Sequence, residues 1–135
     1  MLRYRAARPD RVAHWPADQI QRLDRALLGI SIITLAEARF GWVKSKASAK
    51  FIAHELQRLS NFVQLPIDPD VLEIWALLKA AVTADGISIA DNDLWIGATA
   101  KARGATVVTA DTDFLSLAGH VDLLYLLRKP DSHPG

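Results

Sequence analysis

The sequence predicts an α/β fold with a mostly parallel central sheet and helices on both faces. Short apolar runs rich in β-branched residues, such as GISIIT and ATVVT, alternate along the chain with segments whose apolar residues recur at three- and four-residue spacings. Strands that alternate with helices pair in parallel and are covered by those helices. The chain has 135 residues, of which half are hydrophobic, so it can bury one core but not two. We therefore expect a single domain over residues 1–135, with residues 1–16 irregular and residues 128–135 a frayed tail.

The composition excludes several classes of protein. Sixteen Lys and Arg against fifteen Asp and Glu give a net charge of +1, so any affinity for nucleic acid must come from a local patch. The absence of cysteine excludes disulfides, thiolate zinc sites and thiol nucleophiles, and it fits a reducing cytoplasm. No apolar run approaches the roughly 20 residues of a membrane span. We expect a cytoplasmic protein without a membrane segment.

The expected elements follow one another in a regular order. The patterns predict a helix over 17–27, a strand over 29–34, a helix beginning at Leu35, a helix over 44–59, a strand over 61–67, a helix opened by Asp68-Pro69-Asp70, a helix over about 91–102, a strand over 105–109 and a last strand over 121–127.

Three acids fall where these elements meet. Glu37 follows the strand 29–34, in the first turn or so of the next helix; Asp93 opens the helix before the strand 105–109; and Asp111 follows that strand. The start of such a helix and the end of the strand after it lie at one edge of a parallel sheet, where ligands bind in open α/β folds. Asp91 lies about 200° around the helix from Asp93 and is interpreted as the N-cap. The competing interpretation is that Asp93 only complements the helix dipole.

Carboxylates gathered at one edge repel one another unless a cation is present. Oxygen ligands select a hard divalent ion, Mg²⁺ or Mn²⁺, and a site with few protein ligands leaves waters for hydrolysis. We therefore predict that Glu37, Asp93 and Asp111 are both metal ligands and catalytic residues. Asp113 either joins through a water or is a turn acid.

The segments ITLAEARFG, DNDLWIGATAKARG and VVTADTDF, in this order and at these spacings, resemble three motifs of the PIN domain, and in particular of VapC-type toxins, over residues from about Asp10 to Leu126. The resemblance implies a three-layer PIN-like fold and a Mg²⁺- or Mn²⁺-dependent endoribonuclease of a type II toxin–antitoxin pair, acting on RNA, homodimeric and held inactive by a cognate antitoxin. Glu37, Asp93 and Asp111 match the family's acids, with Thr109 as a polar neighbour.

The front of the chain departs from the family. Nothing matches the family's first strand, which ends in a motif like LDTN, and the acids upstream of Glu37 (Asp10, Asp18 and Asp24) follow no apolar strand. We expect the natural protein to start upstream of Met1; alternatively, residues 1–6 form a poor strand or another chain fills the gap. An incomplete acid set leaves open a second function, a catalytically impaired module that binds RNA or a partner.

Cations and aromatic residues suggest contacts around this site. Arg39, Lys44, Lys46 and Lys50 follow Glu37 and form either an RNA-binding rim, together with Thr109, or a solvated helix face. Trp42 and Trp75 lie on helices whose surfaces a lone domain leaves partly uncovered, so we expect a twofold dimer. The histidines are interpreted as structural or surface residues: His14, His54, His120 and His133.

Overall fold

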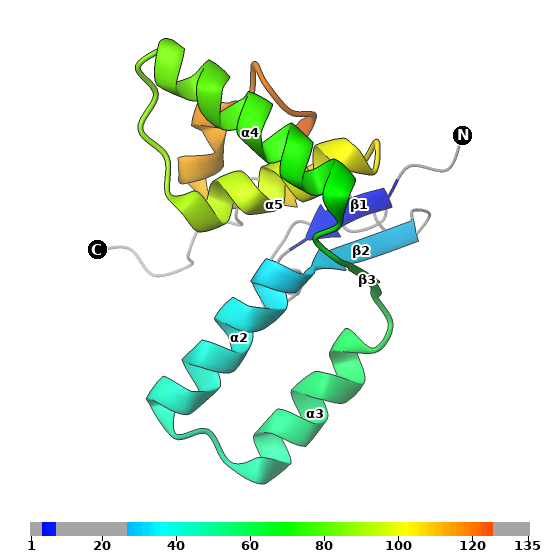
Figure 1. The fold of residues 1–135 in the computed structure, drawn as a ribbon. Coiled ribbons are helices and arrows are strands. Elements are labelled where there is room, and N and C mark those ends of the chain that lie inside the picture. The colour runs from blue at the N-terminus through cyan, green and yellow to red at the C-terminus, as the bar shows by residue number, and fades with distance from the viewer. Residues whose placement is uncertain (1–3, 8–26, 126–135) are drawn as a thin grey trace, which may run out of the picture.

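The computed structural model describes residues 4–7 and 27–125 (Figure 1). A five-stranded sheet in the order β3-β2-β1-β4-β5 forms its centre, and every neighbouring pair of strands is parallel. The strands are β1 (Tyr4–Ala7), β2 (Leu27–Ser31), β3 (Val63–Leu65), β4 (Thr106–Thr109) and β5 (Leu123–Tyr125). Because the strands are parallel, their carboxyl ends share one edge, here named the carboxyl edge.

The helices of the described part are α2 (Ile32–Ser45), α3 (Ala49–Leu59), α4 (Pro69–Ala84) and α5 (Asp91–Ala102), with the 3₁₀ helix η2 (Thr112–Leu117) after β4. Figure 1 shows α4 and α5 side by side against the sheet, whereas α2 and α3 form a hairpin that projects away from it. This α2–α3 hairpin begins directly at the end of β2. None of the described helices has the length and apolar character that crossing a membrane requires.

The core lies where α4, α5, β4 and η2 meet. Leu94, Ile96 and Ala98 of α5 pack with Leu78 of α4 and Phe114 of η2 in one buried cluster. From Asp93 to Ala100, α5 is buried at every residue except Trp95, which explains its many small side chains. A helix enclosed on nearly all sides needs such residues for close packing.

A glycine in α5 shows how tight this packing is. A Cβ added to Gly97 would lie 3.2 Å from the Leu117 Cδ1 atom, closer than ordinary van der Waals contact. The helix predicted over about 91–102 is therefore the central helix of the core.

The expectation that residues 1–16 are irregular is wrong for Tyr4–Ala7, which form β1 between β2 and β4. Of the three alternatives for the missing first strand, the strand within residues 1–6 is closest to the observed β1, which ends one residue later, at Ala7. Ladder hydrogen bonds join backbone groups, so two flanking strands can pair with a segment that lacks an apolar pattern. The helix predicted over 17–27 lies outside the described residues except for Leu27, which belongs to β2.

Two boundaries in the hairpin also differ from the prediction. The run expected as a strand over 29–34 is divided, because the Ser31 hydroxyl accepts the N–H of Thr34 at 3.0 Å and starts α2 at Ile32. The helix expected over 44–59 is divided as well. Lys46 ends α2 in the left-handed region (φ 53°), and Ser48 starts α3 by accepting the N–H of Phe51 at 3.1 Å.

The remaining predicted strands are confirmed with shorter bounds. The strand expected over 61–67 is β3 (Val63–Leu65), the one over 105–109 is β4, and the last is β5 within the predicted 121–127. Asp68 caps α4, as its position before Pro69 predicts, by accepting the N–H of Val71 at 3.0 Å.

Candidate active site

Buried polar side chains gather at the carboxyl edge. The described part buries four polar or charged side chains, and three of them lie there: Ser31 at the end of β2, Asp93 in the first turn of α5 and Thr109 at the end of β4. Burying a polar group is unfavourable unless a partner satisfies it. Ser31 and Thr109 are satisfied here by backbone N–H groups, so the carboxyl edge is a built polar site within a largely apolar interior.

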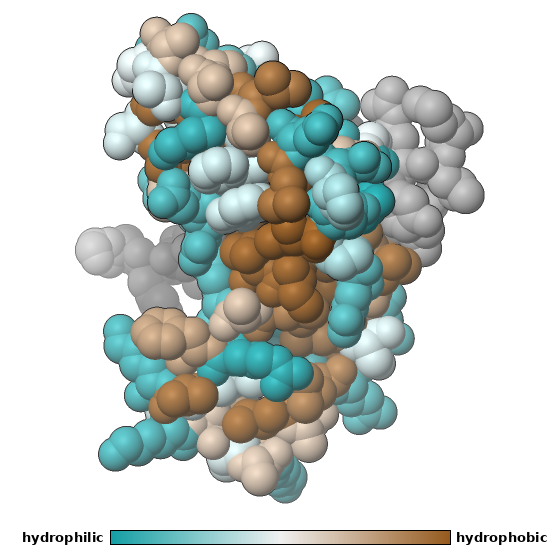
Figure 2. All heavy atoms as spheres, viewed as in Figure 1, coloured by the Kyte–Doolittle hydropathy of each residue, from teal (hydrophilic) through white to brown (hydrophobic). Residues whose placement is uncertain are grey.

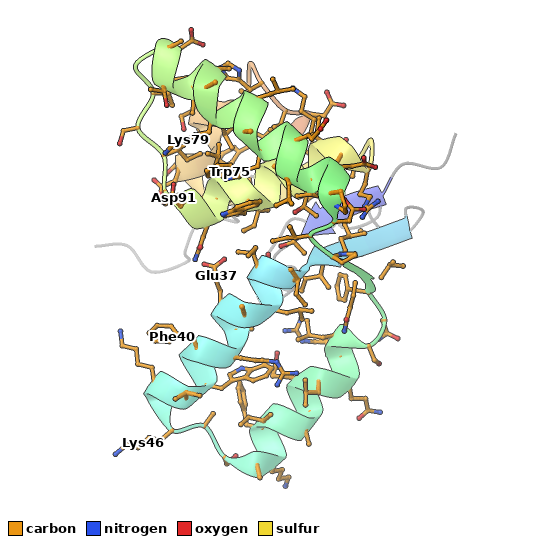
Figure 3. The ribbon with its side chains drawn as sticks, viewed as in Figure 1. Glu37, Phe40, Lys46, Trp75, Lys79 and Asp91 are labelled. Carbon is orange, nitrogen blue, oxygen red and sulfur yellow. The ribbon has the colours of Figure 1, made fainter. Side chains whose placement is uncertain are left out.

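Glu37 lies on α2, close to where the helix leaves the sheet. It is the sixth residue of α2, so it occupies the second turn and not the first turn expected. Its Oε1 atom is buried and has no hydrogen-bond partner among the described residues. Figure 3 shows its side chain directed toward the α4–α5 pair. A buried carboxylate oxygen without a donor is suited to accept a cation or a ligand proton.

Asp93 occupies the first turn of α5 and is only 6% exposed. The partial positive charge of the helix start favours a carboxylate at this position. The N-cap is Ala90, without a side-chain cap bond, so the interpretation of Asp91 as the cap is wrong. Asp91 is instead exposed and pairs with Lys79 of α4, with 3.4 Å between Oδ1 and Nζ. Asp93 and Asp91 thus lie on opposite sides of α5, as their two-residue spacing requires.

Asp111 lies in a tight turn after β4. Its backbone N–H donates to the Thr109 hydroxyl at 3.0 Å, and its Oδ1 accepts the N–H of Asp113 at 3.0 Å. The Asp113 side chain is exposed. The buried hydroxyl of Thr109 therefore fixes the orientation of the chain that presents Asp111.

The three acids come from three segments that meet the same edge, yet the described residues contain no group of three or more His, Cys, Asp or Glu side chains placed to hold a metal ion. The donor chemistry does fit a hard cation, because the set contains only carboxylate oxygens and Glu37 offers one that is buried and unpartnered. Asp10, Asp18 and Asp24 lie outside the described residues.

The predicted rim residues lie on the α2–α3 hairpin, and Thr109 lies apart from them at the end of β4. Arg39, Lys44, Lys46 and Lys50 are all exposed. Lys44 is in the last turn of α2 and Lys46 is its C-cap, so both lie at the tip of the hairpin and away from the sheet.

Aromatic rings and a histidine have structural contacts. Trp75 of α4 stacks on Trp95 of α5 with 4.6 Å between ring centroids, so part of the surface expected at a dimer interface packs within the chain. The Trp75 indole nitrogen is buried, and no residue of the described part is its hydrogen-bond partner. His120 lies 3.1 Å from an Asp85 carboxylate oxygen. His14 and His133 lie outside the described residues.

Comparisons with known proteins identify the class to which this arrangement belongs. The PIN domain family model matches residues 8–120. Ribonuclease VapC5 of Mycobacterium tuberculosis is 36% identical over 106 residues, which cover 73% of this chain and 78% of that protein.

Solved structures agree. A crystal structure of VapBC-5 from Mycobacterium tuberculosis, a member of the VapBC family of toxin–antitoxin systems, aligns with a TM-score of 0.68 and 29% identity over 93% of this chain and 98% of that one. VapBC2 from Rickettsia felis, bound to a DNA fragment from its promoter, has a TM-score of 0.77 and 22% identity, covers 90% of this chain and 98% of that one, and supports the fold.

The parallel sheet and its acidic carboxyl edge are therefore those of a PIN domain, and the chain belongs to the PIN-domain family. Within that family it is a homologue of the VapC ribonuclease toxins.

Proposed function

We propose that the chain is a Mg²⁺- or Mn²⁺-dependent endoribonuclease, the toxin of a type II toxin–antitoxin pair, which hydrolyses RNA phosphodiesters at the carboxyl edge. The observation that carries the proposal is the buried, unpartnered Oε1 of Glu37 at the edge where Asp93 is also buried. Relatives named as ribonucleases support the reaction, and a related structure described as VapBC supports an antitoxin partner.

Glu37, Asp93 and Asp111 would hold the cation, with Asp113 able to contribute through a water. When bound, a divalent ion supplies an activated water and neutralises charge on the phosphate oxygens. The chain's own residues prepare this site. Asp93 lies in the first turn of α5, and the Thr109 hydroxyl orients the turn that presents Asp111. Because the carboxylates act as ligands, hydrolysis requires no histidine base.

The test compares cleavage of RNA in Mg²⁺ and in EDTA. Asp93→Asn and Asp111→Asn should each abolish Mg²⁺-dependent cleavage while the fold remains intact, because each removes a ligand charge and also relieves repulsion in the metal-free protein. Asp70→Asn is the matched control, since Asp70 is an exposed acid in the first turn of α4. Undiminished cleavage by either site variant would remove that residue from the site.

A second candidate function is a catalytically impaired module that binds RNA or a partner. It is favoured by the lack of a three-residue metal-binding group among the described residues. The same assay separates the two functions. Cleavage that disappears with EDTA supports the nuclease, whereas RNA or antitoxin binding without cleavage at any Mg²⁺ or Mn²⁺ concentration supports the module.

A further inference from the structure

Charge is unevenly distributed over the described part. Residues 38–54, the greater part of the α2–α3 hairpin, contain four Lys or Arg residues and no acid, whereas residues 55–125 contain ten acids and only four Lys or Arg. None of the four cations within residues 38–54 forms an ion pair with a described carboxylate, whereas Arg58, near the end of α3, pairs with Glu55. The hairpin is therefore the one strongly basic region of the described chain.

Helix α2 arranges three kinds of side chain in a line. Glu37, Phe40 and Lys44 are spaced at i, i+3 and i+7, so they share one face of the helix. Phe40 is 66% exposed, and its neighbour Val43 is 78% exposed. Figure 3 shows Glu37, Phe40 and Lys46 along the same side of α2, from the sheet to the tip. This row, named here the α2 stripe, begins with a carboxylate, continues with an exposed ring and ends in lysines.

The stability of the hairpin does not explain all of these cations. Lys44 in the last turn of α2 complements the helix dipole and would be favourable without any ligand. Lys50, the second residue of α3, lies at the positive end of its helix, where a cation is unfavourable. Lys46 adopts a left-handed conformation (φ 53°) that glycine or asparagine would adopt at lower cost. A ligand of negative charge gives these two lysines a role.

We propose that the α2 stripe, together with Lys50 at the start of α3, is a binding track for single-stranded RNA, on which a base stacks on Phe40 while Lys44, Lys46 and Lys50 contact phosphates. This inference rests on the proposed function, since the strand would lead to the acids at the carboxyl edge. Lys46 is nine residues from Glu37, about 13 Å along the helix at 1.5 Å per residue, which is within a few nucleotides of the acids.

The mixture of side chains favours single-stranded RNA over a protein partner. Proteins that bind single-stranded nucleic acid without sequence preference combine exposed aromatic rings with neighbouring cations. Large contiguous apolar patches are the surface feature that marks protein–protein interaction sites. Figure 2 shows instead that hydrophobic and hydrophilic residues interleave over the hairpin.

The experiment measures binding of a mixed-sequence single-stranded RNA oligonucleotide in EDTA, so that cleavage does not interfere. Phe40→Ala and Phe40→Leu should each weaken binding about tenfold, while Phe40→Trp should retain it, because stacking needs a ring face. Lys46→Asn/Lys50→Gln should reduce the slope of log affinity against log salt by about 1.4, since each phosphate contact on a single strand contributes about 0.7.

Two controls match these variants. Leu77→Ala removes an equally exposed apolar residue on α4 (68% exposed), and Ala76→Glu/Ala80→Glu changes the net charge by the same amount as the double lysine variant. Both should bind RNA almost as the wild type does. In Mg²⁺, the Phe40→Ala and double lysine variants should raise KM for RNA and leave kcat unchanged, because they act on binding and not on the acids.

Each possible result either supports or refutes the proposed RNA-binding track. If the hairpin variants show wild-type binding and KM while the wild type cleaves RNA, the track is refuted and the nuclease stands. If Phe40→Leu retains full binding and only Phe40→Ala loses it, the surface is apolar and better suited to a protein, which also refutes the track. A wild-type chain that neither binds nor cleaves RNA refutes both proposals.

Discussion

Replacing Glu37 by methionine should stabilise the metal-free protein. The buried Oε1 atom has no hydrogen-bond partner within residues 4–7 and 27–125, and an unsatisfied buried polar atom costs about 1–3 kcal/mol. Methionine has a similar length and no polar atom to desolvate, so Glu37→Met should recover most of that cost. In a domain of this size, 1 kcal/mol corresponds to about 4 °C in Tm, so the variant should melt roughly 4–12 °C above the wild type in EDTA.

Addition of Mg²⁺ should reverse this order. A ligand that binds only the folded state stabilises it by about 2.7 kcal/mol at a concentration 100 times its Kd. The wild type should therefore gain about 11 °C at that concentration, whereas Glu37→Met, which lacks a ligand oxygen, should gain little. Differential scanning calorimetry in EDTA and in Mg²⁺ measures both Tm differences and needs no activity assay.

The control for this experiment is Glu73→Met, which removes an exposed acid from α4 and should leave both Tm values nearly unchanged. A Glu37→Met protein that melts below the wild type in EDTA would refute the view that the buried oxygen is costly. A Glu37→Met protein that gains as much from Mg²⁺ as the wild type would remove Glu37 from the metal site.

Two further predictions concern the α4 helix. The Val71 N–H, with Arg103 as a second partner, holds the pKa of Asp68 below its ordinary value of 3.8. Because the pKa of Asp68 is lower in the folded state than in the unfolded state, its ionised carboxylate stabilises the fold at pH values above the unfolded-state pKa. This stabilisation is lost as the pH falls through the folded-state pKa. Urea unfolding of Asp68→Asn should therefore show a smaller loss of stability on acidification than the wild type does. The chain should also form a twofold dimer, since Leu72 is 52% exposed and Figure 2 shows a hydrophobic area between α4 and the hairpin. Light scattering that finds only monomer at micromolar concentration would contradict the dimer.

The sequence patterns correctly predicted the helices and strands whose local conformational propensity agrees with their packing in the fold. The apolar spacing of α4 placed Val71 and Leu78 inward, and both are buried. The run ATVVT, read as a strand, supplies β4, whose residues 107–109 are buried. In each case a single period assigns both the type of element and its buried face.

The misplaced elements have a different physical origin. The segment Tyr4–Ala7 has no apolar alternation, and its place as β1 depends on backbone pairing with two strands distant in the sequence. The start of α2 depends on one hydroxyl, that of Ser31, inside a β-branched run that resembles a strand. Sequence periodicity contains neither a pairing partner nor a cap geometry.

The order of elements predicted that the segments carrying Glu37, Asp93 and Asp111 meet the carboxyl edge, and they do. The individual environments of the acids were not predictable, since Asp93 and Asp91 differ in burial only through the direction in which α5 packs. A net charge of +1 also concealed the separation of bases from acids, because opposite local excesses cancel in a total.

This separation along α2 has a physical use. Lys46 lies about 13 Å from Glu37 along the helix, which exceeds the Debye length of about 10 Å at 0.1 M salt. The lysines at the tip therefore do little to neutralise the carboxyl edge, which keeps the negative field that a divalent cation requires. The tip in turn keeps the positive field that attracts phosphates. On the proposed track, α2 would hold two opposite fields at a fixed separation, so RNA would bind at the tip without first overcoming the repulsion of the acids.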